Sequence, residues 1–324
     1  MVETKKRDFL FDNLKCIGIV FVVFAHLLEG FDTPATNVLY KIIYLFHMPL
    51  FVFVSGYYAR FNLKKIVKKL VVPYLIFQFV WTIFEYFISH SNQNFLTYIL
   101  TPRWVLWYLF SMIIWKLSTI ALEKVNQKYL PIILIFAVVI GLLSGGGNFD
   151  GYILSISRTL AFYPFFVLGF YFKRLNFRDW RIFKENIFKF GFVVLSMACI
   201  IALFGFFPGL PREALYNAYM YNQISGYNML VRLFMYIGAT VIIFSLMMFC
   251  GKQSSLGSYL GQNSMVIYLV HGLIVRGLSM VLTKFTPYPI FISAMLTVIV
   301  IIISILVGKG WNWLKKSFIE AKKQ

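Results

Sequence analysis

Acidic residues and cysteines are scarce in this sequence. Its 324 residues include 12 Asp and Glu and three Cys, and charged residues make up only 13%. Cys16, Cys199 and Cys250 stand singly within or beside apolar segments. That placement is typical of small buried hydrophobic residues and argues against a disulfide framework or a metal cluster, so no metal is expected.

A phosphate-binding loop is missing as well. The glycine-rich string Ser144-Gly145-Gly146-Gly147 ends an apolar segment and lacks the Lys-Ser/Thr pair of a P-loop. The chain has no polar stretch that resembles a soluble catalytic domain. We therefore expect any chemistry to be carried out by the apolar segments themselves.

Apolar residues are abundant and come in blocks. They make up 60% of the chain, and the blocks are about 20 residues long, the length that a helix needs to cross the hydrocarbon core of a membrane. The pattern predicts an all-α, polytopic bundle of about ten transmembrane helices. They are expected at residues 13–30, 38–59, 70–90, 104–122, 129–145, 156–172, 187–207, 229–250, 263–283 and 287–308.

The positive charge follows the loops rather than a nucleic-acid surface. The net charge is +19, and the basic residues cluster at 5–7, 60–69, 173–184 and 315–323. With ten helices and a cytoplasmic N-terminus, all four clusters fall on the cytoplasmic side, as the positive-inside rule requires. We therefore predict cytoplasmic N- and C-termini in a cell membrane, with a basic surface tail at about 309–324 and no nucleic acid as partner.

The first apolar segment carries a lysine and a histidine on one face. Lys15 and His26 are eleven residues apart, which in a helix is about 20° beyond three full turns and roughly 16 Å of rise. An ionisable group inside a membrane segment is costly and marks a functional site. A long anionic donor such as coenzyme A could place its phosphates near Lys15 and reach His26. Alternatively, Lys15 anchors the helix at the interface and His26 makes a hydrogen bond between helices.

The second segment carries another buried imidazole. His47 is followed by Pro49, which frees backbone groups that a membrane bundle tolerates best beside a cavity. Because the second helix runs antiparallel to the first, His47 is expected at a depth similar to that of His26. The two imidazoles could then meet.

These motifs resemble those of a known family. Lys15-X10-His26 is similar to the Arg/Lys-X10-His signature of the membrane-bound acyltransferase-3 family, and the second-helix string resembles the branch of fucose 4-O-acetylases. Four strings follow in the family's order: Phe46-His47-Met48-Pro49-Leu50-Phe51 with Ser55-Gly56-Tyr57, Arg103-Trp104-Val105-Leu106-Trp107-Tyr108-Leu109, Ser157-Arg158-Thr159 with Pro164-Phe165-Phe166-Val167-Leu168-Gly169, and Asn263-Ser264 with Ile267-Tyr268-Leu269-Val270-His271.

The resemblance implies a single membrane acyltransferase domain over residues 1–324. It would move an acyl group, usually acetyl from cytoplasmic acetyl-CoA, to a hydroxyl of a glycan or glycolipid at the outer face of a bacterial cytoplasmic membrane. His26 is expected to act as general base or as acyl carrier. His47 could stabilise the carbonyl oxygen as it gains negative charge. His271 is expected to make a structural hydrogen bond.

The remaining candidates fall into two groups. Lys15, Lys64 and Lys65 are expected to bind the phosphates of the donor. Trp107, Ser55 and Tyr57 are expected to contact the acceptor. Arg103 and Arg158, which lie toward the outer ends of their helices, could hold charged groups of the acceptor or of the donor, or could simply lie at the membrane interface.

Two other classes of protein remain open. An exporter of a polysaccharide or lipid-linked glycan would also need a polar path through the bundle, although its polar residues should spread along several helices. A non-catalytic membrane scaffold would leave two intramembrane imidazoles unexplained. The partners expected are membrane lipids and a glycan or glycolipid acceptor, and the sequence does not define the oligomeric state.

Overall fold

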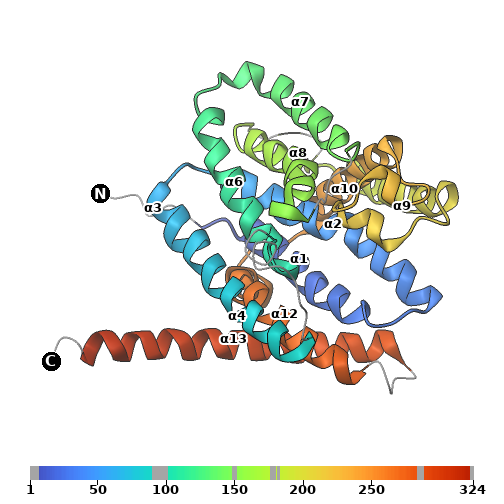
Figure 1. Ribbon diagram of the computed structural model, residues 1–324. Helices are drawn as coiled ribbons and strands as arrows, with labels where there is room; N and C mark the ends of the chain where they lie inside the picture. Colours follow the sequence, from blue (N-terminus) through green and yellow to red (C-terminus); the bar gives the residue numbers. More distant parts are fainter. Residues whose placement is uncertain are drawn as a thin grey trace. The chain divides into compact units, whose positions relative to one another are not determined.

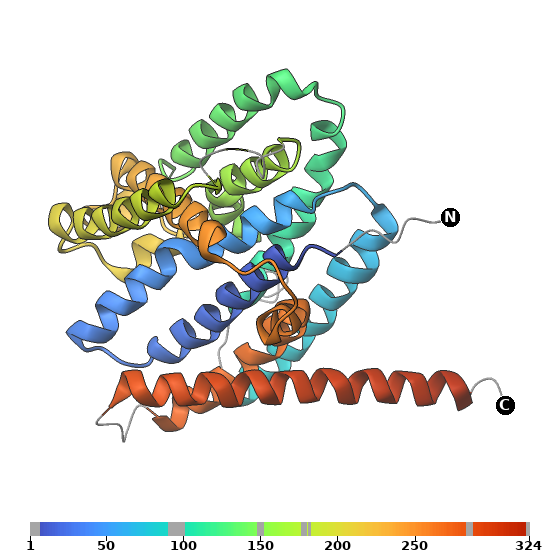
Figure 2. The ribbon, with the colours of Figure 1, turned by 180° about the vertical axis from the view of Figure 1, so that it is seen from behind.

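Helices make up all the regular structure in the described part of the chain. The computed structural model describes residues 7–89, 101–147, 152–175, 180, 183–282 and 288–321, and no strand occurs among them. The predicted basic residues at 5–6, within 176–182 and at 322–323 lie outside this set. Figures 1 and 2 show the helices, with α1 in dark blue and α13 in red.

Each predicted membrane segment has a helical counterpart. The α-helices are α1 (Phe9–Leu28), α2 (Pro34–Tyr57), α3 (Leu63–Ile66), α4 (Val72–Ser89), α6 (Trp107–Leu122), α7 (Leu130–Leu143), α8 (Ile156–Phe172), α9 (Asn186–Phe206), α10 (Met229–Phe249), α11 (Leu256–Gln262), α12 (Ser264–Leu282) and α13 (Pro289–Ala321). Eight of the described segments are long and apolar enough to span a membrane, and the bent pair α11–α12 gives a ninth. The all-α fold class and the multi-pass membrane location are thereby confirmed. The orientation of the termini stays a prediction.

Three segments depart from simple straight helices. A π-helical turn at Val67–Val71 joins α3 to α4, so that one helical segment runs from Leu63 to Phe87. The predicted helix at 263–283 is preceded by α11, and the two are bent by 74°. α7 has only 14 residues and is short for a span. α13 has 33 residues and continues through the predicted surface tail as far as Ala321.

The chain divides into two compact units. One contains residues 1–43 and 251–324, and the other contains residues 44–250, so that α2 belongs in part to each. The sequence-based prediction of a single domain stays a prediction.

In the first unit, α1 packs against α11, α12 and α13. The backbone of Asp12 lies so close to Gly261 that any side chain at position 261 would collide with it. Asn13 holds the entry to α11: its amide donates to the carbonyl oxygens of Gly251 (2.7 Å) and Gln253 (3.2 Å), and its oxygen accepts from Ser255 (2.8 Å). Ser255 in turn caps α11 through the backbone N–H of Ser258.

In the second unit, two motif glycines bring α2 and α8 together. A side chain at Gly56 would collide with the backbone carbonyl of Phe166, and one at Gly169 would collide with the carbonyl of Phe53. Small residues allow this close approach of membrane helices. α8 also packs against α7 and α6, and α10 packs against α9.

A buried arginine anchors the segment between α9 and α10. Arg232 is fully buried; it donates to the carbonyl of Gly141 (2.8 Å), to Ser144 Oγ (2.9 Å) and to the hydroxyl of Tyr227 (2.8 Å). Burial raises the pKa of Tyr227 to about 12, so its hydroxyl remains protonated and donates to Asn217 Oδ1 (3.0 Å). The connecting segment is therefore held in place by hydrogen bonds.

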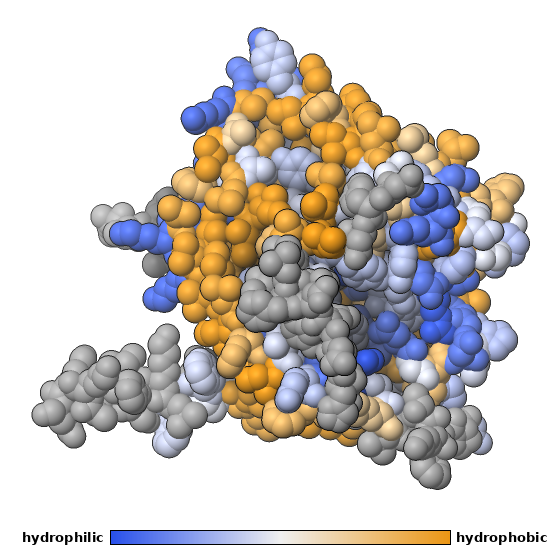
Figure 3. Space-filling view, in the orientation of Figure 1, coloured by the Kyte–Doolittle hydropathy of each residue, from blue (hydrophilic) through white to orange (hydrophobic). Residues whose placement is uncertain are grey.

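Apolar side chains cover much of the face shown in Figure 3. Several of the longest spans expose large hydrophobic residues, among them Phe79 on α4, Ile201 on α9 and Leu306 on α13. In water such a surface would be unfavourable, whereas lipid tails are as apolar as these side chains. The exposed faces therefore fit contact with lipid.

Candidate active site

His26 lies in the last turn of α1, two residues before the helix ends at Leu28. Its side chain is 13% exposed, and Nδ1 lies 3.2 Å from Oε2 of Glu29, the residue that caps the helix. Since a carboxylate oxygen accepts, Nδ1 carries the proton and Nε2 keeps its lone pair. His26 is thus oriented with Nδ1 toward Glu29 and Nε2 as its hydrogen-bond acceptor, the atom that a base would use.

His271 on α12 lies beside His26. The two ring centroids are 5.6 Å apart and the rings are tilted by 34°. His271 is fully buried, and its Nδ1 donates to the carbonyl of Ile267 at 3.0 Å. This is the structural hydrogen bond expected for His271. No group among the described residues donates to its Nε2.

Lys15 is engaged in an ion pair. Its Nζ lies 2.6 Å from Oδ1 of Asp12, and Nε of Arg7 lies 2.6 Å from the other carboxylate oxygen. The Asp12 side chain is 6% exposed, against 24% for Lys15 and 55% for Arg7. The three groups carry a net charge of +1, and the buried carboxylate holds the lysine in place.

His47 in the second unit is buried within a run of aromatic rings. The ring of Tyr44, one turn earlier on α2, meets it edge-on with centroids 4.6 Å apart. Tyr44 in turn lies 5.4 Å from the ring of Tyr216. His26 and His47 belong to different units, and their predicted meeting stays a prediction.

Arg158 lies in an aromatic cage, which we define as Trp107, Tyr152 and Tyr216. Its guanidinium carbon is 5.2 Å from the ring of Trp107 and 4.8 Å from the ring of Tyr152. Its Nε donates to the carbonyl of Tyr216 at 3.3 Å. Arg158 and the cage residues are all half-buried, and none of the described residues forms an ion pair with Arg158. A half-buried guanidinium among aromatic faces can bind a ligand that combines acceptor oxygens with an apolar face.

Strained backbone adjoins each part of the cage. Positive φ angles occur at Trp104 (32°), which precedes α6 and Trp107, and at Leu154 (50°) and Ser155 (48°), which precede α8 and Arg158. Asn217 (54°) follows Tyr216 directly. Such conformations are costly for these residue types and cluster at functional sites. The backbone beside the cage residues is therefore held in conformations that cost free energy, which is typical of a functional site.

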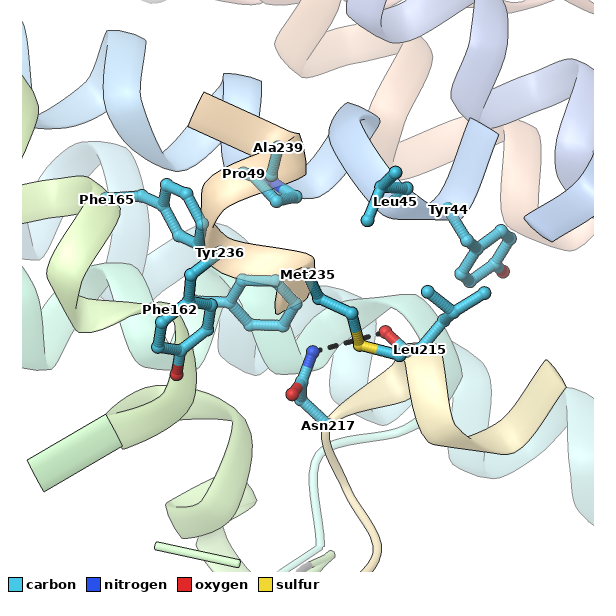
Figure 4. Close-up of a pocket in the computed structure, with 10 residues that line it drawn as sticks. All are labelled: Tyr44, Leu45, Pro49, Phe162, Phe165, Leu215, Asn217, Met235, Tyr236 and Ala239. Carbon is cyan, nitrogen blue, oxygen red and sulfur yellow. Dashed lines mark hydrogen bonds between the residues drawn. The ribbon is translucent and has the colours of Figure 1, made fainter. Parts of the chain in front are cut away.

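A small, mostly apolar pocket adjoins this region. It is lined by Tyr44 and Asn217 together with hydrophobic residues of α2, α8, α10 and the segment between α9 and α10, as Figure 4 shows: Leu45, Pro49, Phe162, Phe165, Leu215, Met235, Tyr236 and Ala239. The amide of Asn217 donates to the carbonyl of Leu215 (3.3 Å), and the hydroxyl of Tyr236 donates to the carbonyl of Ala161 (2.6 Å). The Asn217 amide and the Tyr236 hydroxyl are thus occupied by hydrogen bonds within the protein. Pro49 is one of the lining residues.

The structure places Arg103 differently from Arg158. Its Nη1 lies 3.1 Å from Glu85 Oε2 on α4, its side chain is 9% exposed, and its backbone N–H donates to Gln78. The charge of Arg103 is thus balanced by a carboxylate, and its backbone is fixed to α4.

The other predicted contacts with substrates are distributed along the second unit. The hydroxyls of Ser55 and Tyr108 form a hydrogen bond of 2.8 Å, and Tyr57 lies 5.9 Å from Nζ of Lys173. Both residues are near the end of α2, about 12–15 Å of helix rise beyond His47. Lys64 and Lys65 are exposed on α3. Of the predicted residues in this unit, Arg158 and Trp107 are in direct contact, and Tyr44 and Tyr216 link His47 to them.

Some site residues escaped the sequence reasoning. Glu29 had a usable signal, because an acidic residue three positions after a histidine reaches the same helix face. Tyr44 had the same spacing from His47. Tyr152 and Tyr216 lie in connecting segments without periodicity, and no pattern in the sequence pointed to them.

Comparisons with known proteins identify the family of this chain. The chain is 26% identical over 306 residues to the nodulation protein NolL of Mesorhizobium japonicum, covering 84% of this chain and 78% of the relative. It is 27% identical over 301 residues to NolL of Sinorhizobium fredii, covering 83% and 78%. No solved structure matches the chain. The model of an acyltransferase domain matches residues 9–308, nearly the whole length, so the chain belongs to the acyltransferase-3 family of membrane acyltransferases.

Proposed function

We propose that this acyltransferase moves an acetyl group from acetyl-CoA to a hydroxyl of a glycan or glycolipid. The observation that carries the proposal is the Glu29–His26 pair at the end of α1, a base with its orienting carboxylate. The resemblance of the motifs to those of fucose 4-O-acetylases and the aromatic cage around Arg158 support a sugar as acceptor.

The proton balance follows from the orientation of His26. A hydroxyl is a weak nucleophile at neutral pH, so Nε2 of His26 takes its proton as the oxygen attacks the thioester carbon. The new C–O bond forms, the C–S bond breaks, and the departing sulfur takes the proton from His26 to leave as the thiol. The carboxylate of Glu29 accepts the hydrogen bond from Nδ1 of His26 and so stabilises the imidazolium.

One further group, His47, is assigned by its chemistry, and the transfer also has a covalent version. The carbonyl oxygen gains negative charge during attack, and His47 is the proposed donor that stabilises it. An acetyl-His26 intermediate, followed by attack of the hydroxyl, is the covalent version of the same transfer. The burial of His47 supports a role in a site from which water is excluded.

The donor is proposed to approach from the basic, cytoplasmic side. Lys15, fixed by Asp12, lies about 16 Å of helix rise from His26 on one face of α1, a span that suits the arm of coenzyme A. Lys64 and Lys65 would add positive charge for its phosphates. The acceptor is proposed to bind at the aromatic cage, where sugar faces can stack on Trp107 while the guanidinium of Arg158 donates hydrogen bonds to sugar oxygens.

Purified protein in detergent, incubated with acetyl-CoA and a panel of methyl glycosides that includes methyl fucoside, provides the test. We expect release of free thiol together with an acetylated glycoside detected by mass spectrometry, and neither product with His26→Ala. An intact thioester in the presence of acceptors, with export of a lipid-linked glycan from reconstituted vesicles, would reject the proposal in favour of an exporter.

A further inference from the structure

His271 has a ring nitrogen that makes no hydrogen bond with any of the described residues. Its Nδ1 lies 3.0 Å from the carbonyl oxygen of Ile267, and a carbonyl oxygen can only accept. The Nδ1 proton is therefore fixed on the side of α12, and Nε2 of the neutral ring is a bare acceptor. This atom is fully buried, and none of the described residues donates to it. A buried acceptor without a donor costs free energy, so it points to a donor supplied from outside the fold.

The position of His271 restricts where that donor can come from. Its ring lies 5.6 Å from the ring of His26, so a molecule whose hydroxyl reaches His26 also lies beside His271. The thioester group itself offers a carbonyl oxygen and a sulfur, which are acceptors and cannot satisfy Nε2; the nearest donor on coenzyme A is the amide N–H of its arm, two carbons from the sulfur, and the KM for acetyl-CoA tests that contact. The reacting hydroxyl has a single proton, which goes to His26.

We infer that Nε2 of His271 accepts a hydrogen bond from the hydroxyl next to the one that is acylated, so that the site selects a vicinal diol. The inference rests on the proposed function, because it takes His26 as the base. In this arrangement His271 stays neutral, and no proton is transferred to it. It holds the neighbouring hydroxyl and thereby determines which oxygen of the sugar faces His26.

Two amide variants separate this contact from the structural hydrogen bond. The amide nitrogen of Asn overlays Nδ1 of His, so His271→Asn can keep the bond to Ile267 and loses the acceptor at Nε2. The longer Gln places its amide oxygen near Nε2, so His271→Gln can keep the acceptor. Monodispersity and thermal unfolding in detergent show whether each variant has folded. If one variant has not folded, the other is compared with the wild type.

The experiment measures kcat/KM for methyl fucoside and for the monodeoxy analogue that lacks the hydroxyl beside the acetylated one. We expect kcat/KM of the wild type to be about tenfold or more lower for the analogue than for methyl fucoside, which is the scale of one hydrogen bond to substrate. For methyl fucoside, kcat/KM of His271→Asn should be lower than that of the wild type by a similar factor. For the analogue, the variant and the wild type should have the same kcat/KM, because the substitution and the missing hydroxyl remove the same contact. His271→Gln should recover part of the discrimination.

The outcomes distinguish the inference from its basis. An active wild type that uses both sugars equally, or a His271→Asn variant that discriminates as the wild type does, would overturn the role of His271 alone. If His271→Asn raises KM for acetyl-CoA and still discriminates between the two sugars, the inference is overturned in favour of a contact between His271 and the donor. A wild type that acetylates no glycoside would overturn the proposed function and this inference with it.

Discussion

Gly56 of α2 lies directly against the backbone carbonyl of Phe166 in α8, and Gly169 of α8 lies against the carbonyl of Phe53 in α2. The two contacts are reciprocal, because each helix contributes one glycine to the backbone of the other. Both glycines belong to motifs by which the sequence resembles its family. Their role in these motifs is to let two helices of the second unit touch, and α8 carries Arg158 at its other end.

Gly56→Ala and Gly169→Ala should therefore destabilise the protein. A methyl group at either position meets backbone atoms that cannot move away, and overpacking of this kind costs about 1–3 kcal/mol or more. Gly191→Ala on α9 is the matched control, since a methyl group there has no neighbour within 4 Å. It should gain up to about 1 kcal/mol from helix propensity. Thermal unfolding in detergent measures both, and equal behaviour of the three variants would contradict the close approach.

The helices were largely predictable because bilayer thickness fixes the length of an apolar segment. α8 begins and ends where the sequence placed it, at residues 156 and 172. The 74° bend between α11 and α12 was not predictable, because it falls at Asn263 inside a motif that reads as one helix start. The extension of α13 to Ala321 was also not predicted. The apolar segment ends at the membrane boundary, whereas residues beyond it can continue the helix because helix propensity does not depend on hydropathy.

The sequence predicted those site residues that are energetically unfavourable in a membrane segment, and it did not predict residues of common types in connecting segments. A histidine in a membrane segment stands out, and His26 and His47 were found in this way. Arg158 and Trp107 were found through their motifs. Tyr216 is one of 20 tyrosines and lies between α9 and α10, so only the fold connects it to Arg158.

His26→Ala should abolish transfer. A positioned base contributes on the order of 10²–10⁴-fold to the rate, so the variant should retain about 1% or less of the wild-type kcat. Binding of coenzyme A by titration and thermal unfolding should stay close to the wild type, because His26 is in the last turn of α1 and partly exposed. Retention of more than about a tenth of the rate would remove His26 from the chemistry.

Glu29→Gln should lower kcat while leaving KM for acetyl-CoA nearly unchanged. The amide can still accept from Nδ1 of His26 but no longer neutralises the imidazolium that forms during transfer. Glu29→Asp, which keeps the charge on a shorter arm, should recover part of the rate. The pair of variants separates charge from geometry. If both retain the wild-type kcat, Glu29 is only a helix cap.

Lys15→Ala should raise KM for acetyl-CoA and also lower stability, since it removes one cation from the buried carboxylate of Asp12. The double variant Asp12→Asn with Lys15→Met should recover the stability without recovering KM, because both charges of the pair are gone. The affinity of the wild type for coenzyme A should fall with added salt. A double variant with the wild-type KM would show that Lys15 serves the fold and not the donor.

Arg158 and Arg103 should respond differently to the same substitutions, although the sequence grouped them. Arg158 has no ion-pair partner among the described residues, and its guanidinium lies over the rings of Trp107 and Tyr152, whereas Arg103 is paired with Glu85. Arg158→Lys keeps the charge but loses the planar stacking, so it should raise KM for the acceptor about as far as Arg158→Ala does. Arg103→Ala should instead lower the unfolding temperature, and Glu85→Gln should lower it similarly, because each leaves the partner charge uncompensated.

For the Arg158 variants, transfer to a glycoside is to be compared with hydrolysis of acetyl-CoA by water, which needs no acceptor. Loss of transfer with hydrolysis preserved in the Arg158 variants would place the acceptor at the aromatic cage, and equal loss of both reactions would remove it from there.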